Sequence, residues 1–271
     1  MARHYLDGML NQGEYETILI EKRDDGVAVA TLNRPEKLNA VNGRMHTELS
    51  RLARDFDDDR ESKVLVMTGA GRAFCAGGDF SGGQAPGGGG GNMMVEARRI
   101  VDNILDCNKP IIAAVNGYAM GLGANIALIC DVVVAARSAV FADTHVRMGI
   151  GAGDGGQVIW PLLMGVNRAK YHLMTGDRLG ADEAERLGLV NFVVDDDQLM
   201  EKALAIAARL AQGPLQAIIA SKVPINQWIR SQSAQILPLS LAMEEASMHS
   251  ADAREAQTAF VEKREARFTG R

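Results

Sequence analysis

The sequence predicts an α/β fold followed by a helical C-terminal region. Short apolar runs rich in β-branched residues alternate with segments whose apolar residues recur at helical spacing, which is typical of an α/β sheet. From residue 181 onward the pattern is mainly helical. Of 271 residues, 47% are hydrophobic and 23% are charged, the balance of a folded protein rather than a disordered one. We expect residues 1–197 to form the α/β core and residues 198–271 the helical region.

The first third of the chain begins with a strand pair. Two β-branched runs flank Asp24-Asp25-Gly26, which is a hairpin signal. Arg34-Pro35 then breaks the strand pattern. Apolar residues at helical spacing and a buried strand follow, and the strand leads into Thr68-Gly69-Ala70-Gly71. The predicted strands are residues 17–22, 27–32 and 64–67, and the predicted helix is residues 41–56.

A glycine-rich stretch, residues 81–92, divides the second third from the first. Seven of its twelve residues are glycine, so we expect a flexible insertion within one domain, either a passive loop or a lid that orders over bound substrate. The predicted elements that follow are helices at 93–106 and 123–129, strands at 111–115, 132–135 and 190–194, and two or three amphipathic helices within 198–268.

Several classes of protein are disfavoured by composition. The net charge of −5 provides no basic excess for nucleic acid. Three widely spaced cysteines predict neither a disulfide framework nor a zinc motif. Residues 111–130 carry no charge, but two asparagines and three glycines interrupt them, so we interpret them as a buried strand, turn and helix rather than a membrane span. The start, MARHYLDGML, does not resemble a secretory signal, so we expect a cytoplasmic protein.

Two glycine-rich turns, residues 74–79 and 116–125, are the candidate functional segments. Glycines let a backbone present its N–H groups to a ligand, and two such groups aimed at one oxygen form an oxyanion hole. Glycine turns between strands and helices are also ordinary structural features. Neither turn is a nucleotide loop, because Ile126 stands where the third Rossmann glycine belongs, and the P-loop and G-x-S-x-G patterns are absent.

Five ordered motifs make the chain resemble the crotonase, or enoyl-CoA hydratase/isomerase, superfamily. This resemblance implies a spiral of ββα repeats, with a C-terminal helical region that mediates trimer formation. It also implies assembly as a homotrimer or as a hexamer built from two trimers. The motifs are LNRPEKLNA from Leu32, FCAGGD from Phe74, AAVNGYAMGLGANIALICD from Ala113, AERLGLVN from Ala184 and AFVEKR from Ala259.

The resemblance assigns roles to individual residues. The backbone N–H groups of Gly78 and Leu122 match the oxyanion contacts of the family. Residues at the coenzyme A (CoA) site include two near the C-terminus that can reach a neighbouring subunit's CoA, Phe260 and Lys263. From composition alone, Lys263 is a solvated lysine on a charged helix face. The remaining residues assigned to the CoA site are Lys37, Leu38, Ala40, Ala76 and Asp79.

The chain departs from the hydratase pattern at both catalytic glutamates of the family. Asn125 and His145 occupy their positions, and an amide cannot accept a proton. Asp154 lies in a glycine loop where related dienoyl-CoA isomerases and the chlorobenzoyl-CoA dehalogenase keep a functional aspartate about one position earlier. We predict that Asp154 is the principal proton-transfer residue, with His145 and Asn125 in supporting roles.

Structural roles remain alternatives for several of these polar residues. Asp154 could instead cap the next helix, and His145 could be an imidazole satisfied by its neighbours. Asp143, Arg147 and Asp79 are weaker functional candidates, and a structural role is favoured for each.

The resemblance therefore implies an enzyme that binds acyl-CoA thioesters and stabilises an enolate or related oxyanion. No metal and no cofactor beyond the CoA of the substrate are expected, nor is a nucleic-acid or membrane partner. A thioester hydrolase, a decarboxylase or a C–C hydrolase on the same fold remains open. A non-catalytic acyl-CoA-binding subunit is the alternative from another class.

Overall fold

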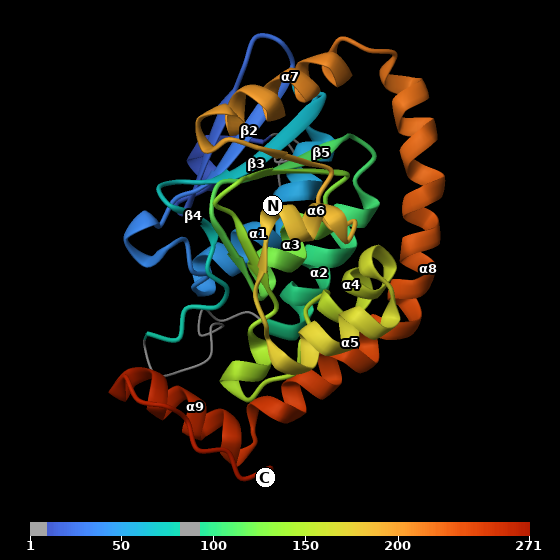
Figure 1. The fold of residues 1–271 in the computed structure, drawn as a ribbon. Coiled ribbons are helices and arrows are strands. Elements are labelled where there is room, and N and C mark those ends of the chain that lie inside the picture. Colours follow the sequence, from blue (N-terminus) through green and yellow to red (C-terminus); the bar gives the residue numbers. More distant parts are fainter. Residues whose placement is uncertain (1–9, 82–92) are drawn as a thin grey trace, which may run out of the picture.

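The computed structural model describes residues 10–81 and 93–271. Its larger sheet has the strand order β1-β2-β3-β5-β7-β10. The β1–β2 hairpin is antiparallel, and every other neighbouring pair in this sheet is parallel. Figure 1 shows β2, β3 and β5 side by side in the upper part of the molecule. The strands of this sheet are β1 (Ile18–Lys22), β2 (Val27–Leu32), β3 (Val64–Gly69), β5 (Ile111–Val115), β7 (Val132–Ala136) and β10 (Phe192–Val194).

A smaller sheet, in the order β4-β6-β8-β9, gives the fold its repeat. A long strand of the larger sheet is followed by a short strand of the smaller one and then by a helix, as in β3-β4-α2 and β5-β6-α3. This confirms the predicted spiral of ββα units. The smaller sheet consists of β4 (Ala73–Cys75), β6 (Tyr118–Met120), β8 (Val140–Ala142) and β9 (Leu179–Gly180), and the two helices are α2 (Met93–Asp106) and α3 (Leu122–Ile129).

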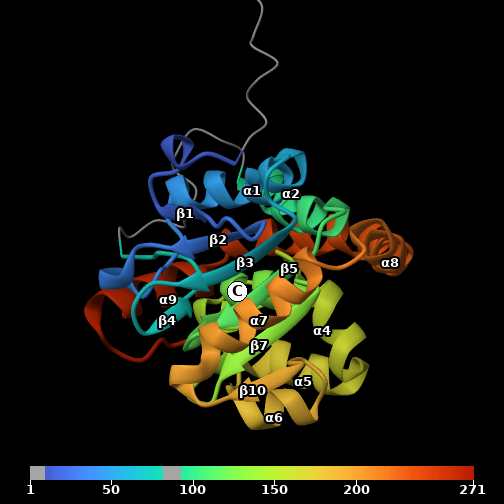
Figure 2. The same ribbon diagram turned by 90° about the horizontal axis from the view of Figure 1, so that it is seen from above.

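Three helices make up the C-terminal region, in agreement with the prediction. The first, α7 (Leu199–Ala211), lies across the larger sheet, where its buried leucine and alanines pack against valines of the strands (Figure 2). The second, α8 (Leu215–Met248), runs down one side of the molecule to α9 (Ala251–Glu262) (Figure 1). Among the described residues, no single helix is long and apolar enough to cross a membrane, and α7 with α8 meets that criterion only as a pair bent by 108°.

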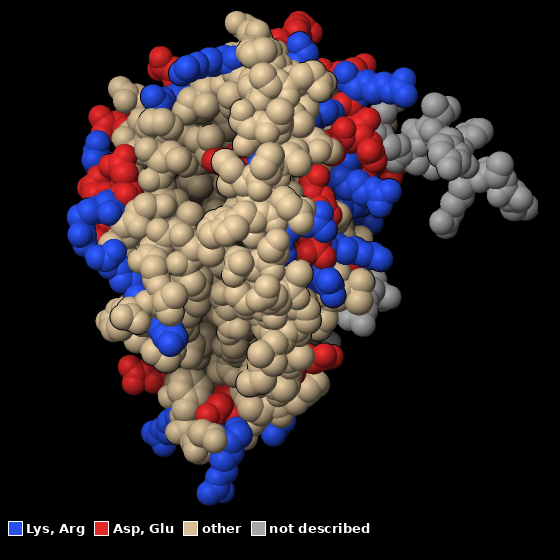
Figure 3. Space-filling view, turned by 90° about the vertical axis from the view of Figure 1, so that its right-hand side faces the viewer, with Lys and Arg blue, Asp and Glu red and all other residues tan. Residues whose placement is uncertain are grey.

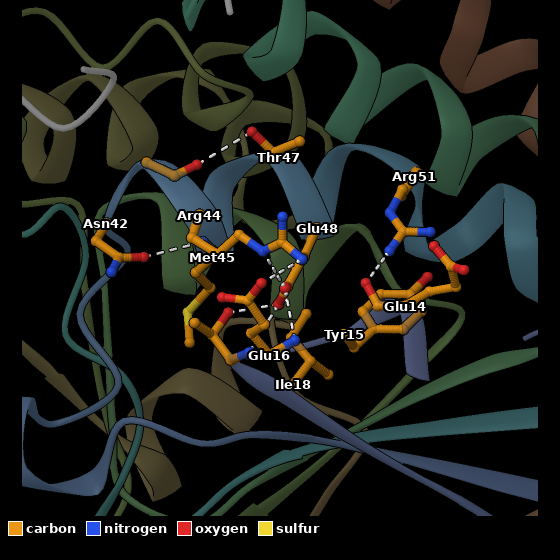
Figure 4. A network of polar contacts seen from close by, with 12 residues as sticks. Glu14, Tyr15, Glu16, Ile18, Asn42, Arg44, Met45, Thr47, Glu48 and Arg51 are labelled. Atoms are coloured by element: carbon orange, nitrogen blue, oxygen red, sulfur yellow. Dashed lines mark hydrogen bonds and ion pairs between the residues drawn. The ribbon is translucent and has the colours of Figure 1, made fainter. Parts of the chain in front are cut away.

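Helix α1 (Gly43–Asp58) is fixed to the first hairpin by a buried glutamate (Figure 4). Glu48 accepts hydrogen bonds from the backbone N–H groups of Glu16 and Thr17 at 2.7 and 3.0 Å, and from Nε of Arg44 at 2.8 Å. Hydrogen bonds to a buried charged group are among the stronger ones in proteins. They hold the helix that carries His46.

Some predicted boundaries differ from the observed ones. The first long helix begins at Gly43 rather than residue 41, because Asn42 caps it through its side chain. The last strand begins at Phe192 rather than residue 190. The expected loop at 81–92 lies outside the described residues except for Ser81. The remaining elements are α4 (Gly156–Met164), α5 (Val166–Thr175), α6 (Ala181–Arg186) and the 3-10 helices η1 (Gln12–Glu14), η2 (Pro35–Lys37), η3 (His145–Met148) and η4 (Asp196–Gln198).

Candidate active site

One cavity of about 540 Å³ brings together most of the residues that the sequence singled out. Its walls come from both glycine turns, from η2 and η3, and from α1, α2, α8 and α9. Most of its lining is apolar, as is common for small-molecule sites. The predicted site residues that line it are Lys37, Leu38, Ala40, Ala76, Gly78, Asp79, Leu122, His145, Asp154 and Phe260.

Two backbone N–H groups in this cavity are available to a ligand. The N–H of Asp79 and the C=O of Gly77 pair with Val41, so Gly78 between them directs its own N–H away from Val41. Leu122 is the first residue of α3, where an N–H has no partner within the helix. Neither N–H has a hydrogen-bond partner among residues 10–81 and 93–271. Their role as an oxyanion pair stays a prediction.

Close packing explains the glycines beside these two groups. A Cβ on Gly123 would lie 2.6 Å from Cβ of Cys75, so a larger residue there would force the two turns apart. Gly77 and Gly121 have φ of 86° and 52°, which side chains rarely adopt. Cys75 itself is buried, and burial raises its pKa to about 12, so the thiol remains protonated at neutral pH.

Asp154 belongs to a buried polar cluster. Its Oδ1 accepts a hydrogen bond from Nδ2 of Asn125 at 2.7 Å, and its Oδ2 lies 3.1 Å from Nε2 of His145. On the other side of the imidazole, Nδ1 lies 2.6 Å from Oδ1 of Asp143. Asn125 also donates to Asp143 and accepts from Nε1 of Trp160 at 2.9 Å, which determines the orientation of its amide. The cluster therefore holds Asp154 and His145 in one fixed arrangement.

The expectation that Asp154 could cap the next helix is wrong. Helix α4 begins at Gly156, its N-cap is Gly155 with φ of 118°, and no side chain caps it. The side chain of Asp154 instead contacts the side chains of Asn125 and His145. His145 is an imidazole satisfied by its neighbours, as the alternative expectation had it, because both ring nitrogens have carboxylate partners. It also lines the cavity.

Glu244, on α8, is a site residue that sequence reasoning missed, as is His46 on α1. Glu244 lines the same cavity, is buried, and has its Oε1 4.0 Å from Nε2 of His145. Its Oε2 is buried without a hydrogen-bond partner in the described structure. One signal was present in the sequence, because Glu244 continues the spacing of the residues that α8 buries, Ser233, Leu237, Ser240 and Leu241.

Burial and neighbouring charges shift the pKa values of His145, Asp154 and Glu244 in different directions. Burial lowers the pKa of His145, but the charges of Asp154 and Asp143 outweigh it and hold that pKa well above its usual value. Burial raises the pKa of Asp154, yet His145 and the Asn125 amide bring it below its usual value. Burial and then the charge of Asp154 raise the pKa of Glu244 to about 8. At neutral pH the cavity therefore contains an Asp154 carboxylate, a His145 imidazolium and a protonated Glu244.

Of the residues expected at the CoA site, Asp79 and Phe260 line the cavity and Lys263 does not. Asp79 pairs with Arg34 at 2.8 Å and accepts from the N–H and hydroxyl of Ser81, so it holds the turn together, the structural role favoured for it. Phe260 lines the cavity of its own chain. Lys263 follows α9 as its C-cap, with φ of 55°, and is not among the residues that line the cavity. Its proposed contact with a neighbouring subunit's CoA stays a prediction.

Asp143, His145 and Asp154 are the described residues that could hold a metal ion, since one ligand atom of each lies within 4.8 Å of the others. A metal ligand must be deprotonated. In this cluster each imidazole nitrogen faces a different carboxylate, and the arrangement favours the doubly protonated ring. The residues therefore fit an ion pair better than a metal centre.

Comparison with known proteins matches the chain to one family over most of its length. The sequence profile of the enoyl-CoA hydratase/isomerase family matches residues 22–271. A probable enoyl-CoA hydratase of Rhodobacter capsulatus is 38% identical over 261 residues, which are 95% of this chain and 99% of that protein. An enoyl-CoA hydratase/isomerase structure from Mycobacterium paratuberculosis is 36% identical with a TM-score of 0.85, covering 90% of this chain and 98% of that one.

A second kind of solved structure is also similar. A β-diketone hydrolase from the cyanobacterium Anabaena, bound to (S)-3-oxocyclohexyl acetic acid, is 28% identical with a TM-score of 0.77. The match covers 87% of this chain and 95% of that one.

Proposed function

Because this chain belongs to the enoyl-CoA hydratase/isomerase family of enzymes, we propose that it binds an acyl-CoA thioester and transfers protons at the carbon next to the thioester carbonyl. The carbonyl oxygen accepts hydrogen bonds from the N–H groups of Gly78 and Leu122. These bonds strengthen as negative charge develops on that oxygen in an enolate, so they lower the barrier to enolate formation.

The observation that carries this proposal is the shared cavity. It contains two backbone N–H groups that have no hydrogen-bond partner in the described structure, together with the ionised Asp154 and the protonated Glu244. Asp154 acts as the base, and Glu244 acts as the acid that returns a proton to the carbon. His145 keeps Asp154 ionised and lies close enough to stabilise the carboxylate that Glu244 becomes.

The replacement of both family glutamates is consistent with this assignment. Asn125 donates hydrogen bonds to Asp143 and Asp154, so it orients the acidic cluster without exchanging protons itself. The carboxyl groups enter the cavity from other elements, Asp154 from the loop before α4 and Glu244 from α8. A cavity with a base, an acid and two N–H groups that lack a partner within the described chain favours an enzyme over a non-catalytic acyl-CoA-binding subunit.

No metal or cofactor beyond the substrate's own CoA is part of the proposal. The proposed CoA segment lines the same cavity as Gly78. It consists of Lys37, Leu38, Ala40 and Ala76. We expect Lys263 to contribute a charge to a CoA phosphate from a neighbouring subunit.

The chain is proposed to assemble as a homotrimer or as a dimer of trimers. The face of the molecule on which α8 lies is broadly uncharged, with lysine, arginine, aspartate and glutamate mostly at its edges (Figure 3). Large apolar side chains on α8 are exposed in the single chain, among them Trp228, Leu239 and Met243. Monomeric proteins rarely leave extended apolar patches in water, so this face supports an interface between copies.

A second candidate function is hydrolysis of a C–C bond between two carbonyl groups. It is favoured by the similarity to the β-diketone hydrolase and by the replacement of both hydratase glutamates. The same oxyanion pair would stabilise the enolate that leaves when the C–C bond breaks.

Turnover of a substrate panel, followed by mass spectrometry, tests both functions. The panel contains enoyl-CoAs and saturated acyl-CoAs of several chain lengths and cyclic β-diketones without CoA. We expect water addition or double-bond migration with an enoyl-CoA, and deuterium incorporation next to the carbonyl of a saturated acyl-CoA in D₂O. Cleavage of the diketones alone establishes the second function, and inertness toward the whole panel contradicts both.

A further inference from the structure

A histidine and a glutamate outside the acidic cluster form a second polar pair at the cavity. His46 of α1 lines the cavity, and its Nδ1 lies 2.9 Å from Oε2 of Glu96 on α2. The hydroxyl of Thr47 donates to the other oxygen of Glu96 at 3.0 Å. The side chains of His46 and Glu96 are only 5% and 13% exposed. Within the described part of the chain, Nε2 of His46 has no hydrogen-bond partner.

This pairing determines which imidazole nitrogen can accept a proton. A carboxylate only accepts hydrogen bonds, so Glu96 selects the tautomer with its proton on Nδ1. Nε2 then keeps its lone pair. Because Nδ1 is directed to α2 and the residue lines the cavity, Nε2 is the nitrogen available to the cavity. A carboxylate that orients an imidazole in this way is a recurrent means of building a general base.

The pair is held rigidly, which a base for a small molecule requires. Helix α1 is anchored to the first hairpin through Glu48, two residues beyond His46 (Figure 4). Glu96 is held by His46 and by Thr47 of the same helix.

We infer that His46, oriented by Glu96, is the general base that activates a water molecule in this cavity, so that the reaction consumes water. This rests on the proposed function and names its reaction class. It separates two tasks: Asp154 and Glu244 handle the proton on carbon, and His46 handles the proton of water.

For an enoyl-CoA the step balances as follows. Nε2 of His46 takes one proton from water, and the water oxygen forms a bond to the β-carbon. The electron pair of the double bond moves to the thioester, whose oxygen is held by Gly78 and Leu122. The α-carbon then takes the proton of Glu244. His46 is left protonated and Glu244 ionised, and transfer of one proton between them through solvent restores the enzyme.

The test separates water activation from proton transfer at carbon. The variant His46→Asn keeps a hydrogen-bond donor toward Glu96 but has no basic nitrogen. It is assayed for water addition to a trans-2-enoyl-CoA, or for the water-consuming reaction that the panel identifies, and for deuterium exchange next to the carbonyl of the saturated acyl-CoA in D₂O. The matched control is His172→Asn, since His172 of α5 does not line the cavity.

We expect His46→Asn to lose about 100-fold or more in the water-consuming rate while exchange and acyl-CoA affinity stay near wild type. Glu96→Gln should give a smaller loss in the same assay, and His172→Asn should lose neither activity. Retention of the water-consuming rate by His46→Asn overturns the inference. Equal loss of both activities, in a variant with the wild-type melting temperature, also overturns it by placing His46 in transfer at carbon. If the wild-type protein neither exchanges nor consumes water, the proposed function fails and the inference fails with it.

Discussion

At the scale of single residues, one buried amide orients the acidic cluster of the proposed site. Asn125 is fully buried, and its three hydrogen bonds reach two aspartates and a tryptophan. A glutamate at this position would place a third carboxylate beside Asp143 and Asp154, which like-charge repulsion disfavours. The amide therefore suits a position between two carboxylates better than a third carboxylate would.

Asp154→Asn tests the base. The substitution keeps the shape and an oxygen for the Asn125 hydrogen bond but removes the charge. We expect turnover to fall by about 100- to 10,000-fold with acyl-CoA affinity nearly unchanged. The pKa of His145 should fall as well, since Asp154 raises it, and NMR titration measures this. Asp182→Asn, at an exposed carboxylate outside the cavity, is the control. Normal turnover in Asp154→Asn would remove Asp154 from proton transfer.

Glu244→Gln tests the buried acid through stability. The pKa of Glu244 rises from 4.5 to about 8 on folding, so between these values the folded state holds a proton that the unfolded state has lost. Wild-type stability therefore falls as pH rises through this window, by up to about 1.4 kcal/mol per pH unit from this group. The variant lacks this term, so its stability relative to wild type should improve from pH 5 to pH 8.

Denaturant unfolding at several pH values measures that difference. The raised pKa of His145 also makes stability fall as pH rises above about 6.5, where the unfolded imidazole loses its proton, but it does so in both proteins. Turnover of Glu244→Gln should be low, because an amide cannot supply the proton. A stability difference that does not change with pH would show that Glu244 is ionised in the folded protein.

The site residues differ in how far the sequence could reveal them. Asp154, His145 and Asn125 lie within thirty residues and close to recognisable motifs, so the resemblance identified them. His46 lies on a helix far before these three residues in the sequence, and Glu244 lies on a helix far after them. Each reads locally as one polar residue in an amphipathic helix, and only tertiary packing shows that it faces the cavity.

At the scale of elements, the start of α3 has the property on which the proposed function depends. The first N–H groups of a helix lack helical partners, and Gly121 and Gly123 allow the β6–α3 turn to approach Cys75 and His145 closely. Proline is favoured at the first helical position because its missing N–H has no helical partner there. Gly121 before it has φ of 52° and ψ of −126°, which glycine adopts readily.

Leu122→Pro therefore removes one oxyanion donor with little effect on the helix. We expect turnover to fall by about 100- to 1,000-fold. Leu122→Ala is the matched control, since it truncates the same buried side chain but keeps the N–H. The alanine variant should lose stability, by about 2 to 5 kcal/mol, yet keep most of its turnover. Steady-state kinetics on both variants decides the matter, and equal rates would exclude the Leu122 N–H from catalysis.

Elements were predictable where their pattern was long enough. The helix Met93–Asp106 and the strand Ile111–Val115 have the predicted bounds, because clear periodicity and Pro110 delimit them. The short strands β4, β6 and β8 were missed, since a strand of three residues shows no measurable alternation. Their pairing arises from the parallel stacking of successive repeats.

At the scale of the whole molecule, the spiral makes one cavity out of segments that lie far apart in sequence. Each repeat places its turn beside the turn of the previous one, so residues 74–79 meet residues 116–125. The ordered motifs predicted this arrangement. They did not predict the path of the last two helices, which place both Glu244 and Phe260 at the cavity of the same chain.

The last prediction concerns assembly. Trp228, Leu239 and Met243 share one face of α8 by their spacing of eleven and four residues, and Leu239 is 66% exposed. We expect sedimentation to show a homotrimer or a dimer of trimers, and Leu239→Glu, which places a charge within this face, to weaken assembly. Lys202→Glu, on α7, adds the same negative side chain elsewhere and should leave the sedimentation unchanged.

The dissociated variant also shows whether one chain suffices for binding. Because the cavity with both oxyanion residues, Asp154, Glu244 and Phe260 is built by a single chain, monomeric Leu239→Glu should still bind acyl-CoA in calorimetry. Any loss of affinity on dissociation should match that of Lys263→Glu in the assembled protein, since Lys263 is the group expected to act across subunits. Complete loss of binding in the folded monomer would mean that the neighbouring subunit supplies an essential part of the site, and a wild-type protein that sediments only as a monomer would contradict the assembly itself.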